Sequence, residues 1–172
     1  MYKLTVATFL FLLMLGCSSE QEKQADRLAS SWLAQEAAHK AGQLSSWTSS
    51  GVTYARYTSL VQEATFAFHE FERGEPEFKG TLFASKLELA LEIHKTAGLV
   101  WQKSIKTSGL VYGWWGKNLA KMYPEIKVPL GKGGASLGQD SYDGDTVVRI
   151  IWQAADEKII EMEAALRGQQ EE

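Results

Sequence analysis

Cysteine and proline are both scarce in this chain, which has one cysteine and three prolines among 172 residues. A single cysteine excludes a disulfide within the monomer and haem attachment through paired cysteines. The aromatic residues, by contrast, are plentiful, with six tryptophans, six tyrosines and seven phenylalanines. This composition indicates a globular protein with a substantial core, neither disordered nor fibrous.

The chain also lacks an apolar run of about 20 residues, the length that a membrane-spanning helix requires. Its longest such run, residues 4–15, carries no charge and follows a short start whose single charge is Lys3. A weakly basic start followed by a short apolar run is typical of a secretory signal. We therefore expect the protein to be exported.

The apolar run ends in Gly16 and Cys17, the only cysteine. This junction resembles the lipobox of bacterial lipoproteins, although Met14 and Leu15 stand where the commonest pattern has Leu and then a small or β-branched residue. The resemblance implies that residues 1–16 are a signal peptide, that the Cys17 sulfur carries diacylglycerol, and that residues 17–24 form a lipidated N-terminus and short tether. The alternatives are an ordinary cleaved signal peptide or an uncleaved apolar anchor, with Cys17 incidental.

Ser18 follows the cysteine, whereas the known signal for retention at the inner membrane in many such lipoproteins is Asp. By the same resemblance, we expect a lipid anchor in the outer membrane with the protein facing the periplasm. Removal of residues 1–16 takes away one lysine, so the formal net charge changes from -3 to -4. The remaining chain fits one domain, residues 25–168, with a short disordered tail at 169–172.

Helical periodicity dominates this domain. Apolar residues recur every three or four positions over residues 25–44, 54–73, 82–106 and 145–166, which predicts amphipathic helices. The third of these has the widest apolar surface and is the predicted central helix, and Asp143 or Asp145 can cap the last. Residues 45–53 have a loop composition. We found no alternating strand run, and predict an all-α bundle of four to five helices.

Residues 110–144 are the least regular part of the sequence. Residues 110–123 combine helical spacing with two glycines, which leaves their structure open. Residues 124–144 have no periodicity and contain two prolines and five glycines, so we predict one long Gly/Pro-containing loop. Loops of this length are uncommon in compact domains and are often functional.

No recognisable catalytic motif occurs in the sequence after the predicted signal peptide. A G-x-S-x-G elbow and a P-loop are both missing, and the Glu36/His39 pair lacks the further ligands of a di-metal bundle. His94 lies on the apolar face of its predicted helix, which favours a core position. We expect no metal and no cofactor; a cell-wall hydrolase acting through Glu70 or Glu92 is the least favoured function.

The remaining constellation interleaves aromatic rings with lysines. Its members are Tyr112, Trp114, Trp115, Lys117, Lys121, Tyr123, Lys127 and Lys132. Aromatic residues dominate protein-binding hot spots, so we predict that this surface binds an envelope protein in an assembly, scaffolding or inhibitory role. The alternatives are binding of anionic lipid or peptidoglycan through residues 110–132, or rings that simply fill the core. Binding of nucleic acid is disfavoured by the expected periplasmic location and by the net negative charge of the chain. The sequence does not predict an oligomeric state.

Overall fold

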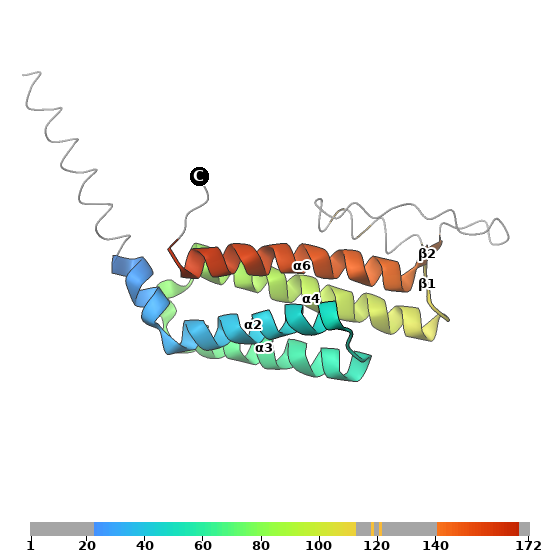
Figure 1. Cartoon of the computed structure of the whole chain (residues 1–172), viewed down its shortest axis with the longest axis horizontal. Helices are drawn as coiled ribbons and strands as arrows, with labels where there is room; N and C mark the ends of the chain where they lie inside the picture. Colours follow the sequence, from blue (N-terminus) through green and yellow to red (C-terminus); the bar gives the residue numbers. More distant parts are fainter. Residues whose placement is uncertain (1–22, 113–117, 119–120, 122–140, 169–172) are drawn as a thin grey trace, which may run out of the picture.

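The computed structural model describes residues 23–112, 118, 121 and 141–168 as a bundle of antiparallel helices (Figure 1). A helical segment, 23–30, precedes α2 (Trp32–Ser50), α3 (Tyr54–Gly74), a 3-10 turn η1 (Pro76–Phe78), α4 (Leu82–Lys106) and α6 (Gly144–Leu166). The predicted all-α bundle of four to five helices is confirmed. Within the described residues, none of the helices is both long and apolar enough to cross a membrane.

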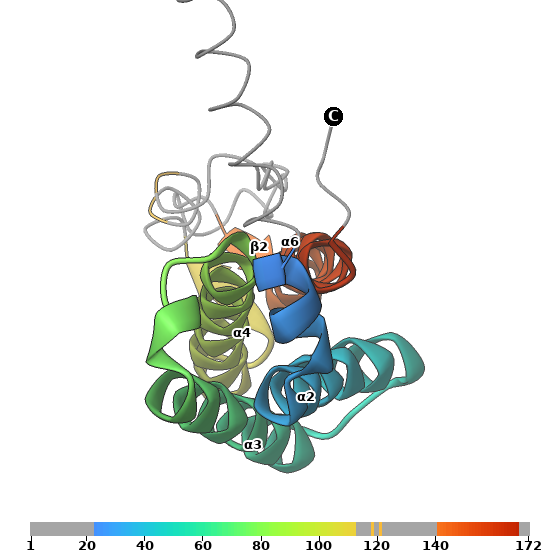
Figure 2. The ribbon, with the colours of Figure 1, turned by 90° about the vertical axis from the view of Figure 1, so that its left-hand side faces the viewer.

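The four long helices alternate in direction and enclose one core. Helix α2 packs against α3, and α4 packs against α6. Figure 2 shows the helices end-on, and Figure 1 shows α4 and α6 running side by side. Helix α4 also contacts α2, α3 and β1, which confirms that 82–106 is the central helix. The largest fully buried side chains belong to all four helices: Leu44, Tyr57, Phe71, Phe83, Leu87, Leu91, Ile93, His94, Val100, Ile151 and Met162.

Each long helix begins at a side chain that accepts a hydrogen bond from the amide three residues later. The four caps are Ser31, Thr53, Thr81 and Asp143. Such a cap satisfies one of the amides that the first turn leaves without an intrahelical partner. Of the two aspartates predicted to cap the last helix, Asp143 is the one that does so, through the amide of Thr146 at 2.9 Å.

The helix predicted over residues 25–44 is interrupted at Ser31. The Ser31 hydroxyl accepts a hydrogen bond from the Ala34 amide at 3.0 Å and donates one to Glu75 at 2.7 Å, so it starts a new helix. The preceding segment 23–30 lies across the end of the bundle, where Arg27 pairs with Glu77 at 3.0 Å and covers the ring of Phe78. Apolar periodicity continues through this break, which is why the sequence did not reveal it.

The prediction of a loop over residues 45–53 is wrong for its first part, because α2 continues to Ser50. The hydroxyls of Thr48, Ser49 and Ser50 donate to carbonyls three or four residues earlier, so these side chains bond within the helix and do not end it. The helix ends only at Gly51, whose φ of 94° is unfavourable for residues with a side chain.

A short antiparallel ladder joins the far ends of α4 and α6. Strand β1 (Leu110–Tyr112) pairs with β2 (Ser141–Asp143) in the register Leu110↔Asp143 and Tyr112↔Ser141. Its three-residue strands are too short to produce an alternating pattern, so sequence analysis missed them. Between the strands, the described chain includes only Asn118 and Lys121; the predicted long loop therefore lies mostly outside the described residues.

Gly144 is the tightest backbone position in the described helices. Its amide donates to the Gly109 carbonyl at 2.9 Å, and a Cβ added at Gly144 would overlap the buried Ser104 side chain and lie 3.1 Å from that carbonyl. The approach of α6 to α4 therefore depends on the missing side chain.

We predict that Gly144→Ala lowers the free energy of unfolding by about 1–3 kcal/mol, the usual cost of overpacking a close contact. The matched control is Gly98→Ala within α4, where the added Cβ would meet Tyr57 at an ordinary 3.6 Å. Removing a mid-helix glycine should stabilise the control by up to about 1 kcal/mol. Urea denaturation of both variants measures the difference, and equal stabilities would contradict the packing described here.

Candidate functional site

The aromatic and lysine residues predicted to bind a partner lie mostly outside the described part of the chain. Tyr112 lies in β1, and Lys121 has an exposed side chain in a helical position. The predictions for Cys17, Trp114, Trp115, Lys117, Tyr123, Lys127 and Lys132 are untested. What the structure does establish is where the segment that contains the aromatic residues and lysines joins the bundle, namely at the β1–β2 ladder.

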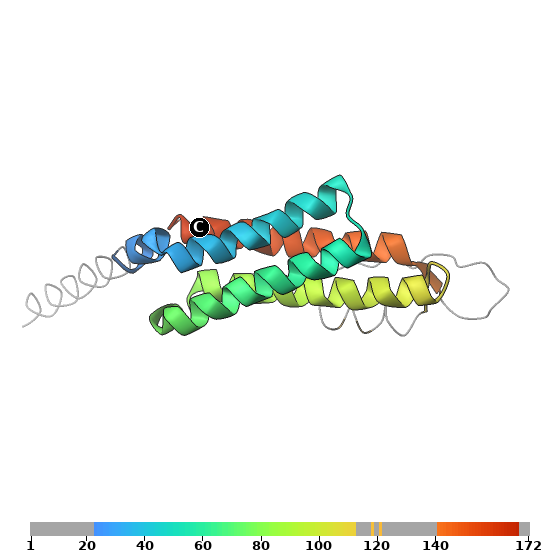
Figure 3. The ribbon, with the colours of Figure 1, turned by 90° about the horizontal axis from the view of Figure 1, so that it is seen from below.

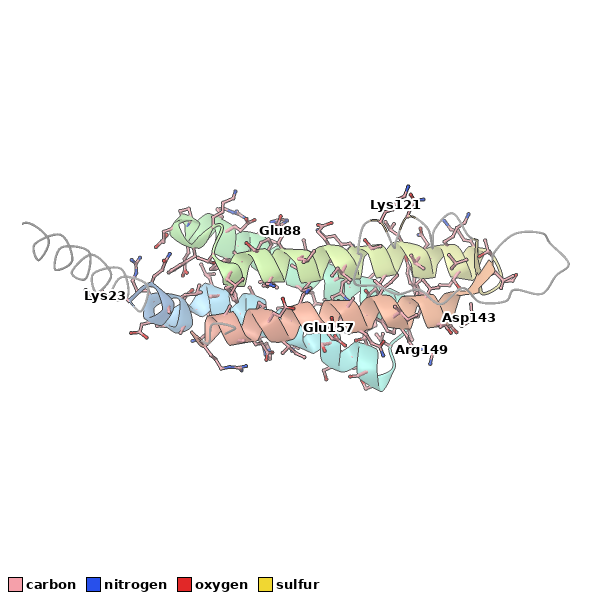
Figure 4. The ribbon with its side chains drawn as sticks, turned by 90° about the horizontal axis from the view of Figure 1, so that it is seen from above. Lys23, Glu88, Lys121, Asp143, Arg149 and Glu157 are labelled. Atoms are coloured by element: carbon pink, nitrogen blue, oxygen red, sulfur yellow. The ribbon has the colours of Figure 1, made fainter. Side chains whose placement is uncertain are left out.

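That ladder and the start of the described chain lie at opposite ends of the bundle. Figure 4 labels Lys23 at one end and Asp143 at the other, with Arg149 near Asp143. Helix α4 has 25 residues, so it spans about 37 Å at 1.5 Å per residue. The predicted anchor and the predicted contact segment therefore join the bundle a full helix length apart.

Midway along α4, a buried polar pair links this helix to α3. The Tyr57 hydroxyl donates its only proton to the His94 carbonyl at 2.7 Å, and it also lies 3.1 Å from His94 Nδ1. The second contact therefore requires Nδ1–H to donate to the hydroxyl oxygen, which leaves Nε2 as a bare acceptor. Complete burial lowers the pKa of His94 to about 4, so the ring is neutral. The predicted core position of His94 is confirmed.

Two tryptophans pack beside this pair and connect α4 with α6. The rings of Trp101 and Trp152 are 5.3 Å apart and nearly perpendicular, and Tyr57 contacts both at 5.4–5.6 Å. Tyr54 packs edge-on against Trp101 at 5.5 Å. Burial raises the pKa of the Tyr57 hydroxyl well above its usual value. The rings thus form one fixed aromatic cluster.

Asp156 on α6 extends this layer towards α2. Burial raises the pKa of its carboxyl group, and the Ser45 hydroxyl pulls the pKa in the opposite direction. Among the described residues, Asp156 Oδ1, His94 Nε2 and the Trp152 indole nitrogen are buried without a hydrogen-bond partner. All four long helices therefore contribute polar groups to one layer. Burying polar groups without partners costs free energy, so such a layer favours one particular arrangement of the helices.

The outer side of the two tryptophans borders an open cleft of about 480 Å³. Its lining comes from the end of α2, the turn after it, α4 and α6: Thr48, Ser49, Ser50, Gly51, Val52, Trp101, Asp145, Val148, Arg149 and Trp152. In Figure 3 the end of α2 diverges from α6 on this side of the bundle. We call this the Trp101–Trp152 cleft, and its volume is in the range of small-ligand sites.

The cleft suits binding better than acid–base or metal chemistry. Asp145 and Arg149 are exposed residues of α6 in its lining, and the other polar side-chain groups there are hydroxyls and the indole N–H groups of the two tryptophans. Within the described chain, no group of three or more His, Cys, Asp or Glu residues is placed to hold a metal ion. Glu70 and Glu92, the carboxylates considered for hydrolysis, pair with Arg73 and Lys95 on solvent-facing positions.

Sequence reasoning did not find this cleft. Thr48, Ser49 and Ser50 were assigned to a loop, and the two tryptophans lie on helices that are distant in the sequence. The available signal was that both predicted helices carry a tryptophan, at 101 and 152, but pairing them requires knowing that α4 and α6 are antiparallel neighbours. No protein-family model matches this chain, and no curated protein or solved structure matches it at a significant level.

The low pKa of His94 predicts a loss of stability in mild acid. The unfolded chain takes up a proton on this histidine below about pH 6.5, whereas the folded chain does so only below about pH 4. Unfolding is therefore favoured progressively as the pH falls through this window. The total effect is about 3 kcal/mol at 1.36 kcal/mol per pKa unit.

Urea denaturation of the wild type and His94→Phe between pH 7.5 and 4 measures this effect. The stability difference between the two should shift by that amount in favour of the phenylalanine variant as the pH falls, and the contribution of Asp156 is common to both. Ile93→Val is the control, because it alters a buried side chain of α4 without removing a titratable group, and its profile should run parallel to that of the wild type. A parallel profile for wild type and His94→Phe would contradict burial of a neutral His94.

Proposed function

We propose that this protein is an outer-membrane lipoprotein of the bacterial envelope that acts by binding, with its anchor at one end of the bundle and its contact surface at the other. The observation that carries the proposal is the separation of Lys23 from the β1–β2 ladder along the bundle (Figure 4). The Trp101–Trp152 cleft adds a surface suited to binding at the ladder end. The predicted partner is an envelope protein reached from the periplasmic face.

The proposed lipid anchor would be joined to a segment, 23–30, that is packed against one end of the bundle. Cys17 precedes Lys23 by few residues, and at about 3.5 Å per residue this stretch reaches no more than roughly 20 Å. The segment 23–30 is held to the bundle end by the Arg27–Glu77 pair and by burial of Leu28. Lipid on Cys17 would therefore hold this end of the bundle close to the membrane surface.

The same geometry distinguishes binding of an envelope protein from direct binding of anionic lipid. An upright bundle would place the ladder about 37 Å further from the membrane, at 1.5 Å per residue of α4. A bundle lying flat would instead bring the ladder itself to the membrane, where residues 110–132 would grip anionic lipid. An upright anchored bundle supports contact with a periplasmic component, and no observation favours hydrolysis at the ion-paired Glu70 or Glu92.

Intact-mass analysis of the protein extracted from membranes tests the anchor. We expect cleavage before Cys17 and the added mass of lipid, and we expect Cys17→Ser to lose both. A mature wild-type protein without lipid would contradict the proposed anchor. The short distance between Cys17 and Lys23 would then no longer place this end of the bundle at the membrane.

Site-specific photo-crosslinking in cells tests the contact end. A crosslinker in place of Trp114 or Trp115 should capture a discrete envelope partner, because this segment is joined to the bundle at the ladder. The control position is Trp32, an exposed residue at the start of α2, which should give no such product. Equal capture from position 32, or capture of lipid alone at 114 and 115, would contradict the proposal.

A further inference from the structure

We propose that the Trp101–Trp152 cleft binds a sugar unit of a neutral glycan strand. This inference rests on the proposed function to the extent that the ladder end faces the periplasm, but its chemistry comes from the cleft itself. It identifies a second contact surface at that end, formed by α2, α4 and α6 rather than by the segment between the strands.

The floor of the cleft is a preorganised pair of indole rings. Trp101 and Trp152 are partly exposed, and an interplanar angle of 77° fixes one ring nearly perpendicular to the other. The buried Tyr57 packs against both rings from the interior, and the partly exposed Tyr54 packs edge-on against Trp101. A fixed aromatic surface offers the apolar C–H face of a pyranose ring a large contact area without the entropy cost of ordering flexible side chains.

The α2 wall is rich in hydrogen-bond acceptors. Thr48, Ser49 and Ser50 already donate their hydroxyl protons to backbone carbonyls of α2, so their oxygens face a ligand chiefly as acceptors. The last turn of α2 contains no basic residue, and the C-terminal end of a helix carries partial negative charge. This wall favours a ligand with several hydroxyl or amide donors.

The α6 wall supplies one carboxylate and one guanidinium. Asp145 adds a further acceptor, whereas Arg149 is the only cationic side chain of the lining; its Nε–H donates to the Asp145 carbonyl at 3.3 Å, and its terminal N–H groups can donate to a ligand oxygen. The two formal charges cancel. An anionic headgroup or phosphate would therefore meet no net attraction, whereas a neutral polyol uses both the acceptors and the donor.

A sugar fits the combination better than a peptide segment does. A pyranose ring carries hydroxyl donors around its rim and an apolar face at its centre, which matches an acceptor-rich wall around an aromatic floor. A peptide offers one backbone N–H per residue and would leave several of the acceptor oxygens unmatched. The volume of about 480 Å³ accommodates one or two rings of a glycan.

Titration of the mature, detergent-solubilised protein with chitotetraose, a neutral oligomer of N-acetylglucosamine, tests this inference by calorimetry and tryptophan fluorescence. We expect saturable binding with a change in tryptophan emission. Arg149→Met and the double variant Ser49→Ala/Ser50→Ala should each weaken binding about tenfold or more, since hydrogen bonds to charged groups and paired hydroxyls are worth roughly that factor. Maltotetraose measures selectivity among neutral glycans.

The altered side chains are exposed, so the variants should retain the wild-type urea transition. Trp32→Ala is the matched control, because it removes an exposed tryptophan at the start of α2, and it should bind as the wild type does. No binding of either glycan, or binding unchanged by the cleft variants, would overturn the inference. If crosslinking at Trp114 still captures a protein partner in that case, the proposed function stands and only the assignment of a sugar to the cleft fails.

Discussion

The packing of α6 against α4 depends on the hydrogen bond from the Gly144 amide to the Gly109 carbonyl, which joins the start of α6 to the turn after α4. This hydrogen bond lies directly beneath the β1–β2 ladder, and it allows α6 to begin against the buried Ser104 of α4. Helices α4 and α6 are distant in sequence, so bringing them together costs chain entropy that short-range contacts do not offset. Their long antiparallel interface supplies the compensating burial, and the glycine at 144 sets how closely they approach at the ladder end.

This packing of α6 against α4 explains why the polar layer and the cleft occur together. Once α4 and α6 are side by side, Trp101 contacts Trp152, and Tyr57 on α3 packs against both while holding His94 by two hydrogen-bonding contacts. Helix α2 reaches the same layer through Ser45 near Asp156, but its last turn diverges from α6 (Figure 3). The interior face of the aromatic cluster is therefore a specific packing layer, and its outer face borders the Trp101–Trp152 cleft.

Much of the fold could be predicted from the sequence because it follows from local apolar periodicity and from residues that cap or end helices. Residues 54–73 and 82–106 gave the bounds of α3 and α4 almost unchanged, and Asp143 was among the predicted caps. Features that depend on tertiary contacts were missed. Ser31 interrupts a continuous apolar pattern because its hydroxyl reaches Glu75, and the serines after Leu44 extend α2 by bonding to their own helix. The cleft needed the pairing of α4 with α6, which periodicity cannot supply, and the lipid anchor concerns residues that the structure does not describe.

We propose an anchored, upright bundle whose ladder end faces the periplasm. The most direct measurement is the membrane depth of a fluorophore, attached to a cysteine replacing Lys23 or Asp145 in the lipidated protein bound to vesicles with quencher-labelled headgroups. The account predicts strong quenching at position 23 and little at position 145, because the two positions are about a full helix length apart. Strong quenching at both positions would show a bundle lying on the membrane and would contradict the account.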